Sequence, residues 1–327
     1  MSTIRLGGDP LLVECDPDAG FVITGIVDAA TGANALWQRT GFVPGAFQRV
    51  LGPAGDLSTD SFVDLFVGGW FEMFPTTGWP GTVAGAVGPT KSLLHGEAMR
   101  LPWQVTHHDG SVLEASVAMV RTPFRLTRRL EVSGNELVVS ERAENTGPVP
   151  APYVWGHHPC FDRATFAGGR FEIDVLSAEV PAPAFDEAHD SLAPGAAFTF
   201  PEAPMVGGGT RDVAAIPGAP DGRHEQTALV VRRGGVRITA PRFGRAFSLL
   251  WDERDFPYVL LWQDYRADGA AFWGTCDTFA VEPSSAPGRS LDDAVAAGKV
   301  RELAPGASVS LTMRARWSAI DEIPARA

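Results

Sequence analysis

Three short stretches, far apart in the sequence, carry side chains that can exchange protons in an enclosed site. The first contains His157 and His158, the second contains His95, and the third contains Glu282. An imidazole and a carboxylate can act as a general acid and a general base when their surroundings shift their pKa values apart. The residue types therefore indicate acid–base chemistry on a small molecule.

His157 and His158 cannot both serve one site if the backbone around them is extended. Adjacent side chains of a strand point to opposite faces, so one histidine should face the site while the other packs or meets solvent. This weakens a metal hypothesis, because a metal site needs three or four convergent ligands. We expect no metal and no cofactor. For each histidine taken alone, the alternative is a buried, hydrogen-bonded side chain without a catalytic role.

Glu282 and His95 occupy unusual local positions. Glu282 ends the apolar run 279–281 and precedes Pro283, so its carboxylate should be held at a strand end. Partial removal from water would raise the pKa of that carboxyl group, which suits proton transfer. The alternative is a charge on an edge strand in water. His95 precedes Gly96, where the backbone can bend closely around a ligand or simply form a turn.

Several tryptophans lie near these stretches. The chain has nine tryptophans and three tyrosines, and Trp70, Trp79, Trp103, Trp155 and Trp262 are close to the chemical residues in sequence. A flat indole can cover the C–H face of a sugar ring while its N–H finds a polar partner. Packing in the core is the commoner role of any single tryptophan.

Alternating hydrophobicity shows which elements must position these residues. Residues 309–317 alternate apolar and polar side chains over their whole length, and residues 124–132 do so except for Arg128 in the apolar row, which predicts strands with one buried face. Turn residues separate further strands, for example at 133–135 and 233–235. These further strands are expected at 11–15, 21–28, 112–121, 137–143, 151–157, 171–176, 227–233, 235–240, 245–251, 257–263 and 278–282.

The pattern predicts an all-β fold of sandwich or barrel type with one short peripheral helix. Ser290 can cap that helix, and Gly298 can end it. Residues 177–226 contain seven prolines and six glycines and show little periodicity. We interpret them as a long excursion from a single domain that spans residues 1–327, with a domain boundary as the alternative.

Composition excludes several kinds of partner. The formal net charge of −12 argues against nucleic acid and against an anionic membrane surface, since either would require clustered lysine and arginine. Three scattered cysteines suit reduced thiols. The sequence contains no signal-peptide pattern and no apolar run of 18 residues, so we expect a cytoplasmic protein. Nothing in the sequence selects between a monomer and a homodimer.

The motifs around the chemical residues occur in a recognisable order. His95-Gly96, followed by Pro102-Trp103, is similar to a His-Gly…Pro-Trp stretch of the aldose 1-epimerase (galactose mutarotase-like) family. Residues 156–161, Gly-His-His-Pro-Cys-Phe, resemble the Gly-Phe-His-Pro-Tyr-Phe stretch of that family, and residues 281–283 resemble the segment with its catalytic glutamate. The resemblance covers residues from about 60 to 317.

This resemblance implies a fold and an activity. The fold would be the large two-sheet antiparallel supersandwich of the family. The activity would be interconversion of the α and β anomers of an aldose, with His158 as proton donor, Glu282 as base, and no cofactor. We expect substrate contacts from His95, Glu72, Trp70, Arg100 and Trp262.

The sequence departs from the family in two places. Residues 68–75, Gly-Gly-Trp-Phe-Glu-Met-Phe-Pro, occupy the region of an Asn-Arg pair in the family, and Glu97 and Met99 replace a Phe and an Arg, with Arg100 one place later. The identity of the sugar is therefore open. One alternative is a 1-epimerase for a phosphorylated or otherwise anionic sugar, whose charge would meet Arg100 or Arg49. Another is a carbohydrate-binding domain without turnover.

Overall fold

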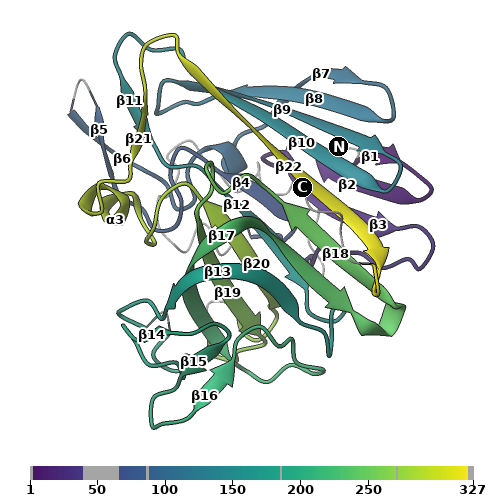
Figure 1. Ribbon diagram of the computed structural model, residues 1–327. Coiled ribbons are helices and arrows are strands. Elements are labelled where there is room, and N and C mark those ends of the chain that lie inside the picture. The colour runs from purple at the N-terminus through teal and green to yellow at the C-terminus, as the bar shows by residue number, and fades with distance from the viewer. Residues whose placement is uncertain (1–2, 40–65, 86–87, 185, 270–271, 323–327) are drawn as a thin grey trace.

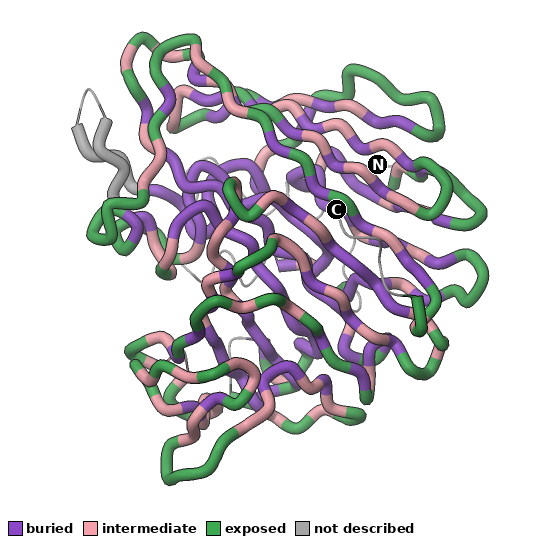
Figure 2. The backbone as a smooth tube through the Cα atoms, in the orientation of Figure 1, coloured by how far each residue is buried: buried purple, intermediate pink, exposed green. Residues whose placement is uncertain are grey.

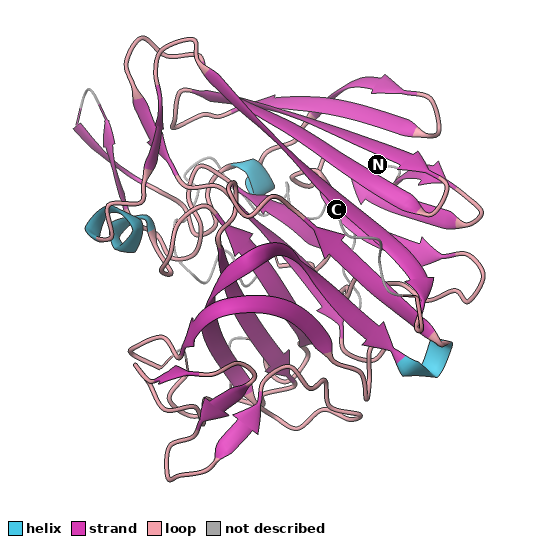
Figure 3. Ribbon diagram, viewed as in Figure 1, coloured by secondary structure: helices cyan, strands magenta, loops and turns pink. Residues whose placement is uncertain are grey.

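Strands make up most of the ordered structure. The computed structural model describes residues 3–39, 66–85, 88–184, 186–269 and 272–322. Within these ranges α3 (Leu291–Ala296) is the sole α-helix, and it is accompanied by two single 3₁₀ turns, η1 (Ala98–Arg100) and η2 (Pro241–Phe243) (Figure 3). The Ser290 hydroxyl caps α3 by accepting a hydrogen bond from the Asp293 amide at 3.1 Å. The all-β prediction and the predicted helix are confirmed.

One large antiparallel sheet contains nearly all the long strands. Its strands, in spatial order, are β1 (Ile4–Gly7), β2 (Leu11–Asp16), β3 (Val22–Asp28), β4 (Trp70–Met73), β12 (Gly156–Asp162), β20 (Asp277–Ser284), β19 (Tyr258–Tyr265), β17 (His224–Ala240), β18 (Arg245–Leu250), β22 (Ser308–Ala319), β10 (Glu136–Asn145), β9 (Phe124–Ser133), β8 (Val112–Ala118) and β7 (Gln104–His108). Strand β13 (Phe171–Glu179) also pairs with β17, and β14 (Ala197–Phe198) pairs with β13.

Three small two-stranded sheets complete the strand inventory of the described residues. They pair β11 (Ala151–Tyr153) with β21 (Arg301–Leu303), β15 (Glu202–Pro204) with β16 (Thr210–Asp212), and β5 (Thr82–Gly85) with β6 (Gly88–Lys91). The β5–β6 hairpin and helix α3 lie together at one side of the molecule (Figure 1).

The large sheet folds over itself into two layers, with β7–β10 and β22 in one and β12, β17, β19 and β20 in the other (Figure 1). The two layers predicted from the resemblance are thus parts of one hydrogen-bonded sheet, joined where β18 pairs with β22. The amide of Gly7 also donates to the carbonyl of Gly110 at 2.8 Å, which ties β1 to the β7–β8 turn. Buried backbone runs along the inside of both layers (Figure 2).

The predicted turn at 233–235 is wrong. Residues 227–233 and 235–240 belong to one strand, β17, which pairs with β19 up to Val230 and with β18 from Gly235 onward. Gly234 allows this change of partner, because a Cβ atom there would lie 2.2 Å from the carbonyl oxygen of Trp251. The glycines serve a close backbone approach rather than a turn. The predicted strand 151–157 is likewise divided between β11 and β12.

Residues 177–226 connect two strands that lie side by side. Strand β13 enters this segment and β17 leaves it, and the two strands pair with each other. Leu192, Ala203 and Val213 from the segment are fully buried in the main hydrophobic cluster. These contacts fit an excursion from one domain, and the single-domain assignment stays a prediction.

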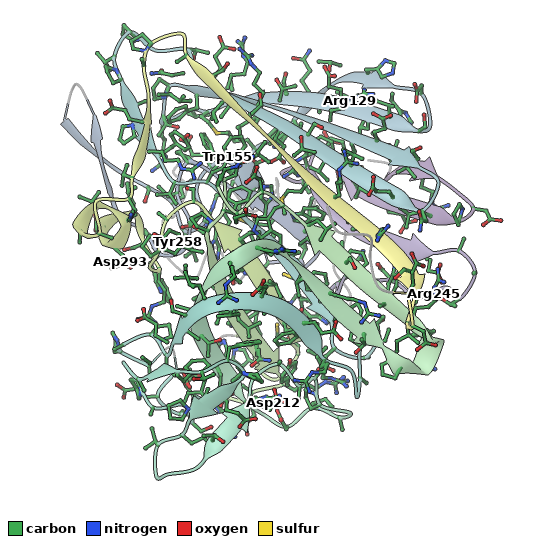
Figure 4. The ribbon with its side chains drawn as sticks, in the orientation of Figure 1. Arg129, Trp155, Asp212, Arg245, Tyr258 and Asp293 are labelled. Carbon is green, nitrogen blue, oxygen red and sulfur yellow. The ribbon has the colours of Figure 1, made fainter. Side chains whose placement is uncertain are left out.

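A buried ionic cluster connects the two layers behind β12. Arg128 of β9 donates to Glu72 of β4 at 3.0 Å and to Glu141 of β10. His157 Nε2 lies 3.0 Å from Glu141 Oε2, and Trp155 Nε1 donates to Glu72 Oε1 at 2.7 Å. Trp155 lies between the layers (Figure 4). The alternation of 124–132 already placed an arginine in the apolar row of that strand.

The two carboxyl groups of this cluster hold different charges. Burial, and then the negative charge of Glu141, raises the pKa of Glu72 well above its usual value. Burial also acts to raise the pKa of Glu141, but Arg128 and His157 outweigh it and lower that pKa to about 2. The cluster therefore pairs one guanidinium with one carboxylate, and Glu72 keeps its proton.

This charge distribution predicts different effects for two isosteric substitutions. Glu141→Gln should lower the free energy of unfolding by about 3–5 kcal/mol, since it leaves the buried Arg128 without its carboxylate. Glu72→Gln should cost less than about 1 kcal/mol, because the amide resembles the protonated carboxyl. Urea denaturation near pH 7 measures both, with Glu302→Gln of β21 as control. Equal losses at the two positions would contradict the assignment.

The same assignment fixes a pH dependence. The folded protein keeps the proton of Glu72 above pH 4.5, where the unfolded chain begins to release it. Folding then takes up a proton, so the contribution of Glu72 to stability falls as pH rises. The stability of Glu72→Gln relative to the parent should therefore increase between about pH 5 and pH 8. A constant or decreasing difference over that range would show that Glu72 is ionised in the folded protein.

Candidate functional site

Strand β12 presents its two histidines on opposite faces, as the alternation predicts. His157 lies opposite Glu72, and His158 lies opposite Phe71, in the pairing of β12 with β4. The His157 side chain turns inward between the layers, where its Nδ1 accepts a hydrogen bond from Trp70 Nε1 at 3.2 Å. His158 is therefore the histidine of this pair that faces the other side of the sheet.

His158 and Glu282 meet on that face. Cys160 pairs with Ala280 in the antiparallel register of β12 and β20, which brings His158 opposite Glu282. His158 Nε2 lies 3.4 Å from Glu282 Oε1, and both residues are 4% exposed. Strand β20 lies between β12 and β19 in the sheet. Glu282 is thus a buried carboxyl group on a central strand, and the alternative of an edge-strand charge in water is wrong.

His95 approaches the pair from a loop. Its φ of +57° and the φ of +79° at Gly96 make a left-handed bend, which a glycine adopts without strain. The amide of Gly78 donates to His95 Nδ1 at 3.2 Å. The imidazole rings of His95 and His158 have centroids 5.2 Å apart. The three residues that the sequence singled out, His95, His158 and Glu282, are therefore brought together.

Aromatic rings surround His158. Phe71 stacks on its imidazole, with ring centroids 4.6 Å apart and an interplanar angle of 19°. Trp262 and Phe66 meet the same ring edge-on, at 5.7 and 6.0 Å. These rings belong to a hydrophobic cluster separate from the main core. The surroundings of His158 are consequently apolar on several sides.

The second ring nitrogen of His158 has its own partner. Cys160, two residues along the same face of β12, has its Sγ 3.2 Å from His158 Nδ1. Burial raises the pKa of the Cys160 thiol well above its usual value, so the sulfur keeps its proton. The thiol and the strand together orient the ring so that Nε2 faces Glu282.

Burial determines the charges of the pair. It lowers the pKa of His158 to about 3 and raises the pKa of Glu282 well above its usual value. Burial, followed by the neighbouring basic groups of His158 and Arg100, lowers the pKa of His95 as well. The shifts of His158 and Glu282 favour a neutral imidazole beside a protonated carboxyl at neutral pH. The pair then holds one proton that can be exchanged over a short distance.

The other residues expected to contact a substrate are divided between the two sides of the sheet. Trp262 lies beside His158, and Arg100 is buried in the turn that follows His95, close enough to affect the pKa of His95. Glu72 and Trp70 lie behind the sheet with His157, so the structure does not bring them to the His158–Glu282 pair. Arg49 lies outside the described residues.

Sequence reasoning missed Phe71 and Cys160. Cys160 could have been found, because strand alternation places it on the same face as His158. Phe71 could not, because its stacking depends on the register between β4 and β12, which are more than eighty residues apart in sequence.

Two further findings concern metal sites and membrane-spanning helices. Within the described ranges, no group of three or more His, Cys, Asp or Glu side chains is placed to hold a metal ion. No helix in the same ranges is both long enough and apolar enough to span a membrane.

Solved structures share this architecture over their whole length. The Slr1438 protein from Synechocystis sp. PCC 6803 superposes with a TM-score of 0.69 at 18% identity, over 97% of this chain and 96% of that one. A candidate aldose 1-epimerase from Escherichia coli K12 gives 0.69 at 17% identity, over 97% and 99%. A galactose mutarotase-like protein from Lactobacillus casei ATCC 334 gives 0.65 at 15% identity, over 97% and 100%. The fold is that of the galactose mutarotase-like proteins.

Comparisons of the sequence with known proteins found no match that would assign a function. No protein-family model matches the chain, and no curated protein matches it either. Because the identities to the solved structures are below 25%, the likeness establishes the architecture alone. The chemistry of this protein depends on its own residues.

The charge state of His158 can be measured directly. Since burial lowers its pKa to about 3, its imidazole should stay neutral, and its ¹³Cε1 and ¹⁵N resonances should stay constant, from about pH 8 to pH 5. His189 is the internal control, because hydrogen bonds to Asp268 and Asp186 raise its pKa above 6.5. The His158→Asn variant assigns the signal. A His158 resonance that titrates near pH 6.5 would show that its surroundings are wetter than the structure indicates.

Proposed function

We propose that this protein interconverts the α and β anomers of an aldose by opening and closing the sugar ring. The observation that carries the proposal is the 3.4 Å approach of His158 Nε2 to Glu282 Oε1 in a buried, aromatic-lined site. Ring opening requires one base for the anomeric hydroxyl and one acid for the ring oxygen. An imidazole and a carboxyl group with opposed pKa shifts supply both.

The proton steps balance without an added reagent. Glu282 removes the proton of the anomeric hydroxyl while His158 Nε2–H donates a proton to the ring oxygen. The bond between the anomeric carbon and the ring oxygen breaks, and the anomeric carbon becomes an aldehyde. Rotation about the adjacent carbon–carbon bond exposes the other face of the aldehyde. Closure then runs with the roles of the two groups reversed.

The resting charges fit this cycle. A neutral His158 beside a protonated Glu282 contains the same number of protons as a charged imidazolium beside a carboxylate. One proton transfer between the two groups converts the resting pair into the acid and base that the reaction uses. The sugar's polar atoms would stabilise the charged form when they enter a site that is otherwise dry.

The neighbouring residues have supporting roles in this proposal. His95 would hold the ring-oxygen side of the sugar or an adjacent hydroxyl. Trp262 would present apolar ring surface to the C–H groups of the sugar. Glu72 and Trp70, behind the sheet, would hold β12 in place rather than touch the substrate.

Two alternatives remain open to test. Arg100 is a buried cation near His95, which favours a phosphorylated or otherwise anionic sugar in the same reaction. A carbohydrate-binding domain would use the same surface without turnover. The anionic-sugar epimerase differs from the main proposal in its substrate. The binding domain differs because it would not interconvert the anomers of its sugar.

Replacing the base separates a catalyst from a binder. Glu282→Gln keeps the size of the side chain but removes the base, so the rate of anomer interconversion should fall by about 10²–10⁴. Affinity should change little, because the amide oxygen still accepts a hydrogen bond from the anomeric hydroxyl. His158→Asn should have a similar effect, and the double variant should be little worse than either single one.

Polarimetry or NMR exchange between anomers measures the rate, and calorimetry measures affinity. Glu302→Gln and His107→Asn, both on surface strands, are the matched controls and should retain the parent rate. A Glu282→Gln protein that binds and interconverts its sugar like the parent would remove Glu282 from the mechanism. A parent protein that binds an aldose without interconverting its anomers would favour the binding domain.

A further inference from the structure

A cavity lies next to the proposed site, between helix α3 and strands β13, β17 and β19. Its volume is about 490 Å³. Volumes of about 300–1,000 Å³ are usual for pockets that hold small molecules. Tyr258 contributes to its floor and Asp293 to its wall, and both are seen beside α3 in Figure 4. The proposed reaction at His158 and Glu282 uses none of the residues that line this cavity.

The floor of the cavity continues the surface that carries Glu282. Leu260 of β19 lines the cavity and pairs directly with Glu282 of β20. Ser284 lies two residues beyond Glu282, and Ala228 of β17 lies opposite Leu260, so alternation places all of them on one face. Directly opposed side chains in a sheet have Cβ atoms about 5 Å apart. The cavity therefore begins one side chain away from Glu282.

The two walls of the cavity are held against each other. One wall is the loop before α3, and the other is the start of the segment 177–226. Arg289 of the first wall donates from Nη2 to the carbonyl of Pro183 in the second, at 3.1 Å. The amide of Arg289 in turn donates to Asp293 Oδ2 at 2.8 Å. These contacts join the two walls of the cavity.

The lining favours a neutral, hydroxyl-rich ligand. Its charged side chains are Glu179, Asp293 and Arg289, two carboxylates against one guanidinium. An anionic group would meet net repulsion there, whereas carboxylates accept hydrogen bonds from hydroxyl groups. The floor adds apolar surface from Ala228 and Leu260. Apolar surface with a few polar groups around it suits the two kinds of surface of a sugar ring.

We propose that this cavity binds a second, neutral sugar unit, so that the substrate is a reducing disaccharide or longer oligosaccharide. The proposal rests on the proposed function, which places the reducing-end ring at His158 and Glu282. The anomeric hydroxyl of that ring must stay free for the reaction. The second unit is therefore attached through another carbon of the ring, and extends over Leu260 into the cavity.

The first experiment compares substrates. Rates of anomer interconversion are measured by polarimetry for the monosaccharides glucose and galactose. The same measurement is made for maltose, cellobiose and lactose, and for a disaccharide with galactose at its reducing end. We expect kcat/KM of the preferred disaccharide to exceed that of its own reducing-end monosaccharide by about tenfold or more. Glucose 6-phosphate and galactose 6-phosphate test the anionic alternative, and a preference for either would overturn the assignment to neutral sugars.

The second experiment fills the cavity from two sides. Ala228→Phe fills it from the floor, and Ala197→Phe, at an exposed position of β14, fills it from the wall. Each should lower the ratio of disaccharide to monosaccharide kcat/KM to about one. Ala118→Phe, at an exposed position of β8, is the matched control and should leave the ratio unchanged. A high ratio that persists in both filled variants would overturn the proposal.

The outcomes separate this proposal from the proposed function. If monosaccharides and disaccharides are interconverted equally well, the second-unit site is wrong and the reaction stands. If no sugar is interconverted, the proposed function fails, and calorimetry with the same disaccharides decides the remaining question. Disaccharide binding that is lost in Ala228→Phe and Ala197→Phe would support the cavity as a sugar site. Absence of disaccharide binding to the parent would overturn it.

Discussion

The pairing of β12 with β4 on one side and β20 on the other determines where the groups of the proposed site lie. A shift of β12 by one residue would exchange the places of His157 and His158, so that His158 would face the core and no longer meet Glu282. In the observed register, His158 faces Glu282 and stacks on Phe71. The chemistry that we propose depends on this register more than on any single contact.

The buried carboxyl groups of Glu141 and Glu282 lie on opposite sides of β12 and differ in their charge. Behind the strand, Arg128 holds Glu141 ionised and so connects the layers by charge. In front of it, burial is the largest influence on the pKa of Glu282 and favours its protonated form. A carboxylate tied to a guanidinium connects two strands, whereas a protonated carboxyl 3.4 Å from a neutral imidazole is placed to exchange its proton. Strand β12 thus separates the ionic cluster around Arg128 from the proposed acid–base pair.

The sequence predicted the features that depend on local pattern. Alternation predicted the all-β fold and the opposite orientations of His157 and His158. The order of three motifs, through the family resemblance, predicted that His95 and Glu282 lie close to His158. The predictions that were wrong concern features that depend on pairing between distant segments. Strand β4 has four residues, all buried, so its sequence has no alternation from which the inward orientation of Glu72 could be inferred. The length of β17 escaped detection because a pair of glycines signals a turn and a close backbone approach equally well.

Gly68 and Gly69 limit which residues can precede strand β4. Both have left-handed φ values, +77° and +74°, and a Cβ atom would lie 2.4 Å from the carbonyl oxygen of Trp37 at Gly68 and 2.6 Å from that of Ile23 at Gly69. No side chain fits at either position without moving the backbone. An Asn-Arg pair like that of the family the sequence resembles could therefore not replace Gly68 and Gly69 without a backbone shift. In the proposed site, a change in sugar preference would therefore have to arise at positions other than these two.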